Sequence, residues 1–299
     1  MKIVYVTGCL GFIGSHVTRV CLKAGWYVRG IDKVTYASNG KLLKEFLKFK
    51  NFVYENKDIN DIKWLYDCDY VINTAAETHV DNSIVKSDDF VHSNINGVHN
   101  LLELIRKKNN YKMPTLLHFS TDEVYGDIVD GSHKETDLLK PSNPYSATKT
   151  AAEHMIASYH NTYGTTFRTV RMSNNFGPRQ HKEKLVPTIL RKIKSGEKIP
   201  IYGDGKNIRD WFYVKDCANM VKSVLLNGSD NEVYNLTFSN EKQNLEIVDT
   251  ILEKLGLKFS ECVEFVTDRP GHDFRYSICN KKILIFQLSF SHNSFAFRK

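Results

Sequence analysis

The N-terminal half of the chain alternates short apolar runs with longer segments of helical periodicity. Residues 2–7 are a β-branched and aromatic run, a glycine-rich turn follows, and apolar side chains then recur at helical spacing over residues 12–24 and again over residues 94–107. Further apolar runs typical of strands lie at residues 27–31, 52–54, 70–73, 116–120 and 169–172. Strands and helices that alternate in this way form a parallel sheet covered on both faces. We therefore predict an α/β fold with a Rossmann-like, doubly wound parallel sheet.

The pattern changes after Asn175. Turn sequences such as residues 177–178 and 269–271 divide the rest of the chain into shorter elements. We predict a first domain over residues 1–175 and a smaller C-terminal α/β lobe over residues 176–299. The sequence contains no internal repeat and no Gly/Ser-rich linker, so we expect the two parts to pack as one unit.

Composition narrows the possible partners. The 299 residues are 41% hydrophobic and 25% charged, and no long stretch lacks charges, so we expect a protein that does not bind membranes. The net charge of +7 is not concentrated in a dense basic cluster, which argues against nucleic-acid binding. Six scattered cysteines show no spacing that suits a metal or a disulfide framework. We therefore expect no metal, and because the N-terminus carries no targeting signal we expect a cytoplasmic location.

A glycine-rich loop follows the first predicted strand. Gly8, Gly11 and Gly14 form a G-x-x-G-x-x-G pattern, in which glycines let the backbone approach a pyrophosphate at a helix N-terminus. Asp32 ends the second predicted strand, where a carboxylate accepts hydrogen bonds from adenosine ribose hydroxyls. Asp32 would also repel a 2′-phosphate, which favours NAD over NADP, although the neighbouring Lys33 weakens that preference.

A tyrosine and a lysine lie four residues apart at the start of another helical segment. At this spacing Tyr145 and Lys149 project from one face of a helix that we expect to continue to residue 163. An ammonium beside a phenol favours the phenolate, so we expect Lys149 to lower the pKa of Tyr145 toward the range of a base. Most pairs at this spacing are surface residues. This pair, however, follows the apolar run 116–120, whose polar end would open beside the cofactor.

These motifs together resemble those of the extended short-chain dehydrogenase/reductases and, within them, of the dTDP-glucose 4,6-dehydratases. The resemblance covers about residues 1–280. It is carried by residues 7–14, 32–37, 75–81, 120–126, Tyr145 with Lys149, 173–178 and 268–273. By this resemblance, residues 1–175 form the NAD-binding domain with the catalytic residues, and residues 176–299 mainly bind the nucleotide sugar.

The most specific motif is Thr121-Asp122-Glu123, because related epimerases and decarboxylases lack the Asp-Glu pair. Removal of water across C5 and C6 of a hexose requires both a base and an acid. The resemblance implies that Tyr145 takes the C4 hydroxyl proton, Thr121 bonds that hydroxyl, Glu123 takes the C5 proton and Asp122 protonates the departing C6 hydroxyl. The hydride borrowed by NAD from C4 returns to C6, so the product is an NDP-4-keto-6-deoxyglucose.

The same resemblance assigns binding residues. It places Lys149 on the cofactor ribose, Arg209 and Arg269 on the diphosphate, whose oxygens suit a guanidinium fork, and Tyr202 on the base. The full set of NAD contacts is Gly8, Gly11, Phe12, Ile13, Gly14, Asp32, Lys33, Thr35, Asp58, Ile59, Ala75, Ala76, Ser93, Tyr145, Lys149 and Asn175. The substrate contacts are Thr78, Thr121, Asn174, Lys184, Leu185, Pro200, Ile201, Tyr202, Arg209, Asn244, Arg269 and His272.

Several alternatives stay open from the residues alone. A nucleotide-sugar 4-epimerase or decarboxylase would share NAD, Tyr145 and Lys149 but would not require the Asp-Glu pair. A non-catalytic NAD-binding scaffold on the same fold would need neither Tyr145 nor Lys149. For the nucleotide, dTDP is the expectation from the family and UDP is a close second. The resemblance also implies a homodimer through the helices that follow Asn94 and Ser146, and a step in deoxysugar (rhamnose-type) biosynthesis.

The C-terminus departs from the pattern of the family. After Lys281 the family continues into a Leu-Gly-Trp turn and an amphipathic helix, whereas this chain has the apolar run 283–290 and ends at Lys299. The run is a possible packing or aggregation segment. Because the expected catalytic groups all precede it, we predict that the atypical tail affects stability before it affects chemistry.

Overall fold

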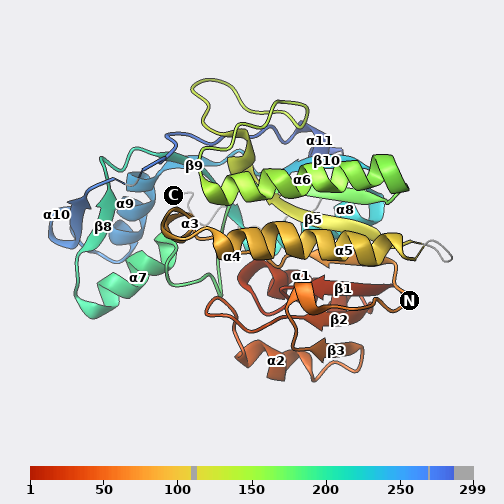
Figure 1. The fold of residues 1–299 in the computed structure, drawn as a ribbon. Coiled ribbons are helices and arrows are strands. Elements are labelled where there is room, and N and C mark those ends of the chain that lie inside the picture. Colours follow the sequence, from red (N-terminus) through yellow and green to blue (C-terminus); the bar gives the residue numbers. More distant parts are fainter. Residues whose placement is uncertain (109–112, 269, 286–299) are drawn as a thin grey trace.

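A seven-stranded parallel sheet forms the centre of the computed structural model, which describes residues 1–108, 113–268 and 270–285 (Figure 1). The strand order is β10-β6-β5-β4-β1-β2-β3, and every neighbouring pair is parallel. The strands are β1 (Ile3–Thr7), β2 (Tyr27–Ile31), β3 (Phe52–Glu55), β4 (Tyr70–Asn73), β5 (Thr115–Thr121), β6 (Phe167–Met172) and β10 (Glu232–Leu236). The first six coincide with the predicted apolar runs, and the Rossmann-like α/β prediction is confirmed.

Helices cover both faces of this sheet, and α5 and α6 lie together on the face toward the viewer in Figure 1. None of the described helices is long and apolar enough to cross a membrane. The longer helices are α1 (Phe12–Lys23), α5 (Gly97–Arg106), α6 (Pro144–Tyr163), α7 (Leu185–Ser195), α8 (Val214–Asn227) and α9 (Asn244–Lys254). The shorter ones are α2 (Lys41–Phe46), η1 (Ile59–Asp61), α3 (Val80–Val85), α4 (Asp88–Phe90), η2 (Val91–Asn96), η3 (Asp122–Tyr125), α10 (Phe259–Cys262) and α11 (Lys281–Leu284).

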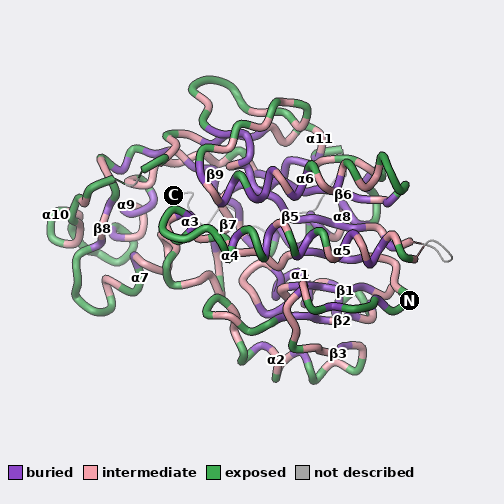
Figure 2. The backbone as a smooth tube through the Cα atoms, in the orientation of Figure 1, coloured by how far each residue is buried: buried purple, intermediate pink, exposed green. Residues whose placement is uncertain are grey.

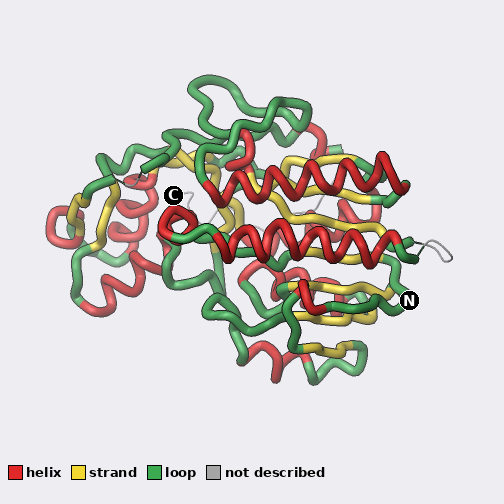
Figure 3. Tube along the Cα trace, in the orientation of Figure 1, coloured by secondary structure: helices red, strands yellow, loops and turns green. Residues whose placement is uncertain are grey.

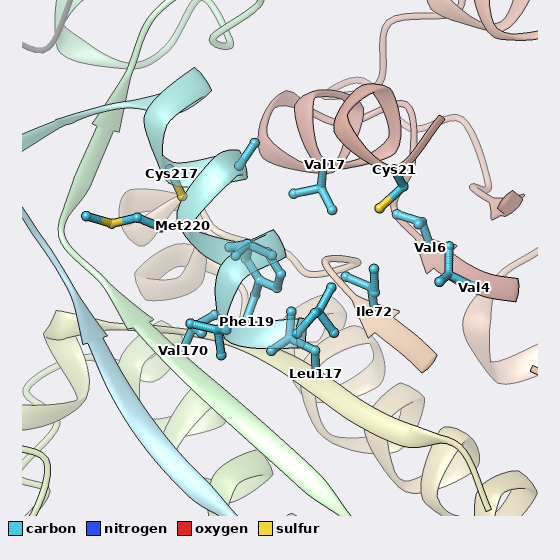
Figure 4. Packing of buried hydrophobic residues seen from close by; sticks show 14 of the residues in the cluster. Val4, Val6, Val17, Cys21, Ile72, Leu117, Phe119, Val170, Cys217 and Met220 are labelled. Carbon is cyan, nitrogen blue, oxygen red and sulfur yellow. The ribbon is translucent and has the colours of Figure 1, made fainter. Parts of the chain in front are cut away.

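Two apolar layers fix the helices to the sheet. On one face, Val17 of α1 and Met220 of α8 pack against strand residues such as Val6 and Leu117 (Figure 4). On the other face, side chains of α5 and α6, among them Ile156, pack against strand residues of β1, β4 and β5. Figure 2 shows the strands as the most buried part of the molecule. Burial on both faces explains why the strands are continuous apolar runs rather than alternating ones.

The predicted helix over residues 94–107 is not a single regular helix. Residues Val91–Asn96 form the wider π-helical turn η2, and the regular helix α5 begins only at Gly97. A Cβ atom at Gly97 would lie 2.0 Å from Cδ1 of Ile59, so glycine at this position allows η1 to pack closely. Such wide turns are frequent at functional sites. Here the turn carries Ser93, one of the predicted cofactor contacts.

A smaller lobe stands beside the main sheet in Figure 1. It contains a three-stranded sheet in the order β11-β9-β7 and a two-stranded parallel sheet of β12 and β8. The strands are β7 (Asn174–Phe176), β8 (Ile199–Tyr202), β9 (Ile208–Tyr213), β11 (Glu241–Gln243) and β12 (Val263–Val266). Phe176, Ile189, Trp211 and Ile247 belong to a separate apolar core that holds α7 and α9 to these strands.

The chain does not divide simply at residue 175. Helix α8 and strand β10 come from the predicted second lobe, yet α8 packs on the main core and β10 completes the main sheet by pairing with β6. The sequence pattern changes near residue 175, where the chain first passes from the main domain into the smaller lobe. Local composition does not show that the chain later returns to the main domain. After the return, Ile283 of α11 is fully buried in the main core, while Ile285 is 76% exposed. The rest of the predicted apolar tail lies outside the described residues.

Candidate active site

A pocket opens where β1, β2 and β4 end, at the point where the strand order reverses. Gly8 follows β1 and has a φ of +69°, a conformation that glycine adopts without strain. A Cβ atom at Gly14 would lie 2.1 Å from the carbonyl oxygen of Gly8, so the turn closes only with glycine at this position. Helix α1 begins at Phe12 directly after this turn, with Ile13 next, and its free N–H groups suit an anion.

Asp32 holds the glycine turn in place. Its carboxylate accepts hydrogen bonds from the backbone N–H of Leu10 at 2.9 Å, from that of Val34 at 2.8 Å and from the hydroxyl of Ser38 at 2.8 Å. Only 6% of Asp32 is exposed. The carboxylate therefore stands at the pocket wall with its orientation set by three donors, and its remaining lone pairs can accept bonds from ribose hydroxyls.

Lys33, the cation beside Asp32, does not oppose the preference of Asp32 for NAD over NADP. Nζ of Lys33 lies 3.0 Å from Oδ2 of Asp58. Burial opposes the charge of Asp58, but hydrogen bonds from Asn60 and Lys33 outweigh it and lower the pKa of Asp58 to about 2. Because Asp58 engages the charge of Lys33, that lysine is a weak partner for a 2′-phosphate. The geometry supports NAD rather than NADP.

The pocket gathers many of the predicted cofactor contacts in one hollow. The predicted residues in its lining are Gly8, Gly11, Asp32, Lys33, Thr35, Asp58, Ile59, Ala75, Ala76 and Ser93. The lining also includes residues that the sequence did not single out as contacts, namely Ile31, Ala37, Ser38, Lys57, Thr74 and Glu77. Their only signal in the sequence is that they neighbour the motifs. A channel of this kind, with carboxylates at one end and a helix N-terminus beside it, fits a dinucleotide.

The predicted catalytic residues meet at the end of β5. Thr121 ends the strand, Asp122 and Glu123 lie in the turn η3, and Tyr145 and Lys149 lie in the first two turns of α6. All but Glu123 are buried, and Glu123 is half-buried. The hydroxyl of Thr121 bonds that of Tyr145 and also donates to Oδ1 of Asp122 at 3.2 Å.

Asn143 joins the two halves of this cluster, and the sequence reasoning missed it. Its side chain accepts the backbone N–H of Ser146 at 2.9 Å and caps α6. Its Nδ2 donates to Oε2 of Glu123 at 3.4 Å. The signal in the sequence was an asparagine directly before Pro144, which is typical of a helix start.

Asp122 is set up as an acid. Complete burial, followed by the negative charge of Glu123, raises the pKa of Asp122 to about 8. Its Oδ2 is buried and has no hydrogen-bond partner among the described residues. A carboxyl group with this pKa is largely protonated at neutral pH and can donate a proton to a ligand oxygen.

The pKa of Tyr145 is not lowered as the sequence predicted. Burial and the negative charge of Glu123 raise the pKa of Tyr145 above its usual value, and the bond from Thr121 only partly offsets them. Burial also lowers the pKa of Lys149 to about 8, while Glu153 opposes this effect. The prediction that Lys149 lowers the pKa of Tyr145 is therefore wrong, because desolvation disfavours both charged forms.

Residues of the smaller lobe contact the segment that follows β4. Lys184 precedes α7, and its Nζ donates to the carbonyl oxygen of Thr78 at 3.1 Å. The hydroxyl of Tyr202 donates to Oδ2 of Asp81 at 3.5 Å, and its ring stands edge-on to His272 at 6.4 Å. These contacts bring Lys184 and Tyr202 of the smaller lobe against residues 78–81 of the main domain.

Other predicted substrate residues are placed less simply. The guanidinium of Arg209 donates to the backbone carbonyls of Ile208, Asp273 and Phe274 and stacks on Tyr276 at 4.3 Å, so a diphosphate would have to share it. The side chain of Ile201 lies in the core of the smaller lobe, which leaves only its backbone for a ligand. Asn174, Asn175, Leu185, Pro200 and Asn244 are half-buried, and Arg269 lies outside the described residues. These binding assignments stay predictions.

The composition of the site agrees with its chemistry. It offers a tyrosine, a lysine, a protonated carboxyl and a second carboxylate beside a dinucleotide-shaped pocket. The residues that the structure describes include no group of three or more His, Cys, Asp or Glu side chains placed to hold a metal ion. The arrangement suits proton and hydride transfer at a sugar carbon.

A profile of the NAD dependent epimerase/dehydratase family matches residues 4–237. The chain belongs to this family. The match includes both the dinucleotide pocket and the cluster at the end of β5, so the resemblance read from the motifs is confirmed.

Curated relatives in this family cover most of the chain. The Low-salt glycan biosynthesis protein Agl12 of Haloferax volcanii is 42% identical over 280 residues, which are 92% of this chain and 89% of the relative. The dTDP-glucose 4,6-dehydratase of Haemophilus influenzae is 40% identical over 310 residues, with 94% and 91% of the two chains covered.

Solved structures of the family have the same fold. The dTDP-glucose 4,6-dehydratase DesIV from Streptomyces venezuelae, solved with NAD bound, has a TM-score of 0.92 at 35% identity and covers 100% of this chain and 95% of its own. A UDP-glucuronic acid 4-epimerase from Bacillus cereus, also with NAD, has a TM-score of 0.90 at 27% identity, with 97% and 94% covered. The family thus contains both dehydratases and epimerases.

Proposed function

We propose that this chain is an NAD-dependent nucleotide-glucose 4,6-dehydratase, a hydro-lyase, with dTDP-glucose as its first substrate and UDP-glucose as the second candidate. One observation carries the proposal. Asp122, with a pKa raised to about 8, lies beside Glu123 in the turn that faces Tyr145. An acid and a base side by side are what elimination of water needs. The relatives named dTDP-glucose 4,6-dehydratase support the choice of nucleotide.

The residues around Tyr145 carry out the oxidation at C4. When bound in the pocket at the switch point, NAD supplies a hydride acceptor that later returns the hydride to the substrate. To act as the base, Tyr145 first has to lose its own proton, which burial opposes by raising its pKa; the phenolate then takes the proton of the C4 hydroxyl. Thr121, already bonded to the tyrosine, holds the same hydroxyl. Lys149 lies one helical turn further on, where it would hold the cofactor ribose.

Asp122 and Glu123 carry out the elimination of water. A ketone at C4 acidifies the proton at C5, and Glu123 removes it. Asp122 gives its proton to the C6 hydroxyl, which leaves as water. The unpartnered Oδ2 of Asp122 supports this role, since a buried oxygen without a partner is ready to bond a ligand. The returned hydride would add to C6 while protonated Glu123 gives its proton back to C5, so the reaction consumes no cofactor.

The remaining assignments are finer. We place the protein in the cytoplasm and in a step of deoxysugar (rhamnose-type) biosynthesis. A homodimer through α5 and α6 is supported by the outer faces of these helices, which other described elements leave uncovered in Figure 1. Tyr163 at the end of α6 is 47% exposed, and Val91, in η2 before α5, is 41% exposed. Covering such apolar groups is a common reason for dimerisation.

The test is a direct assay. Purified protein is incubated in parallel with dTDP-glucose and UDP-glucose, without added NAD. The alkali-induced absorbance of a 4-keto-6-deoxy product and the mass loss of one water are then followed. We expect product from dTDP-glucose and less from UDP-glucose, and no product from Glu123→Gln. Failure with both substrates after NAD is added, together with conversion of UDP-galactose, would show an epimerase instead.

A further inference from the structure

A buried ion pair lies beneath the proposed catalytic residues. Arg171 of β6 and Glu153 of α6 are joined by Nη2 and Oε2 at 2.6 Å, and Nε of the arginine lies 3.1 Å from both carboxylate oxygens. The side chains are only 6% and 7% exposed. Burying two charges is costly and is often no more stable than an apolar pair, so a buried pair invites the question of what else it does.

The pair is linked to both ends of the segment that carries Thr121, Asp122 and Glu123. Before the segment, the hydroxyl of Ser120 donates to Oε1 of Glu153. After it, Nη1 of Arg171 donates to the hydroxyl of Tyr125 at 2.6 Å, and this hydroxyl donates to Oδ1 of Asn235 at 2.8 Å. The guanidinium also stacks on the ring of Tyr125 at 4.7 Å. The ends of the catalytic turn are therefore held by one network.

The same carboxylate acts on Lys149. Glu153 follows Lys149 by one helical turn of α6, so both side chains lie on the face that packs on β5. Burial disfavours the charge of Lys149, and Glu153 is the charged group that opposes this effect. The ammonium thus depends on a carboxylate that bonds Arg171 and Ser120 and is not among the predicted cofactor or substrate contacts.

The other groups that face this pair do not replace Glu153. His118 of β5 lies near Lys149 and is neutral, because burial first and Lys149 second lower its pKa well below the usual value. From η2, Asn94 donates to the hydroxyl of Thr148 and carries no charge. From β6 and η3, the facing groups are Arg171, which is cationic, and the neutral phenol Tyr125.

We propose that Glu153 is a positioning residue of this active site: it keeps Lys149 protonated and, through Arg171, holds the turn that carries Asp122 and Glu123. This rests on the proposed function only in that Lys149 and the turn are placed in the reaction. It assigns to one carboxylate the coupling of the hydride-transfer half of the site to the elimination half.

The first test is the pH dependence of hydride transfer, measured as the absorbance of reduced NAD in a single turnover with dTDP-glucose. Without Glu153, Lys149 loses its proton at lower pH. We expect the alkaline limb of Glu153→Gln to move down by about one pH unit. Glu153→Asp keeps the charge and should restore most of the wild-type profile. Glu103→Gln is the matched control, because Glu103 bonds Tyr159 at the far end of α6, and its profile should not move.

The single variant leaves Arg171 buried and unpaired and so risks misfolding. The double variant Glu153→Gln/Arg171→Gln removes both charges together and covers this risk. If the pair served stability alone, the double variant would regain the wild-type pH profile, and the proposal would be overturned. An alkaline limb that stays at lower pH in a folded double variant supports the proposal.

A second readout needs no turnover. The difference in free energy of unfolding between wild type and Lys149→Met, followed against pH in urea, reports the titration of Lys149. We expect its midpoint to fall when the same difference is taken in the Glu153→Gln/Arg171→Gln background, and an unchanged midpoint would refute the proposal. A wild-type protein that reduces NAD but forms no dehydrated product would reject the dehydratase instead and leave this measurement valid.

Discussion

Nδ2 of Asn143 lies 3.4 Å from Oε2 of Glu123, so the residue that caps helix α6 also orients the proposed base. The long loop between η3 and α6, visible in Figure 3, returns the chain to this point. The helix that carries Tyr145 and the turn that carries Glu123 are thereby fixed to each other. Their spacing does not depend on the flexibility of the connecting loop.

Asn143→Ser separates the two roles of this residue. Serine still caps a helix but is too short to reach Glu123. We expect unchanged stability and a kcat lowered about fivefold, which is the loss of one hydrogen bond of about 1 kcal/mol. Asn143→Ala should lose the cap as well and unfold with about 1 kcal/mol less free energy. An activity of Asn143→Ser equal to that of wild type would show that the contact with Glu123 is unimportant.

Asp122 should cost the protein stability at neutral pH. Its folded pKa of about 8 lies above the usual aspartate pKa of 3.8. The group therefore contributes stability that is fully present below pH 3.8 and is lost as the pH rises through about 8. Asp122→Asn removes this loss, and we expect it to unfold with about 1–3 kcal/mol more free energy than wild type at pH 8.

The same variant separates the two half-reactions. Asp122→Asn should still reduce bound NAD on adding dTDP-glucose but should release no dehydrated sugar, because no acid protonates the C6 hydroxyl. Absorbance of reduced NAD and mass spectrometry of the sugar measure the two events. Normal dehydration by this variant would assign the acid to another group.

Cofactor choice should depend on Asp32 rather than on Lys33. Removing the carboxylate's charge in Asp32→Asn removes its repulsion of a 2′-phosphate, and we expect the ratio of NADP to NAD affinity to rise about tenfold. Asp61→Asn neutralises a nearby exposed acid and should leave the ratio unchanged. Equal ratios in both variants, measured by fluorescence of the bound reduced cofactors, would contradict the role of Asp32.

The end of the described chain should matter for stability and not for chemistry. Ile283 is fully buried in the main core, so Ile283→Ala should cost about 2–4 kcal/mol of unfolding free energy while kcat stays unchanged. Ile285 is 76% exposed, and Ile285→Ala is the matched control with little expected effect. Urea unfolding and the dehydratase assay decide the matter. A fall in kcat for folded Ile283→Ala would link the C-terminal segment to the reaction.

Local pattern was sufficient for much of the fold. The first six strands, helix α1 and the helix from Pro144 to Tyr163 follow directly from apolar periodicity and start signals. The glycine turn and Asp32 were also recognisable, because a dinucleotide site at a strand end needs those residues in that order. The return of residues 214–236 to the main sheet could not be recognised from the local pattern, because it depends on the pairing of β10 with β6.

The sequence by itself determined which chemical groups are present and on which elements they lie, because periodicity and turn signals are local properties of the chain. Only the tertiary structure decided how those groups behave. The pKa values of Asp122, Tyr145 and Lys149 depend on burial by elements distant in sequence. The pKa of Tyr145 is raised where the sequence predicted a lowered one, because desolvation outweighs the neighbouring charge. The links from Asn143 to Glu123 and from Glu153 to Arg171 likewise join residues that only packing brings together.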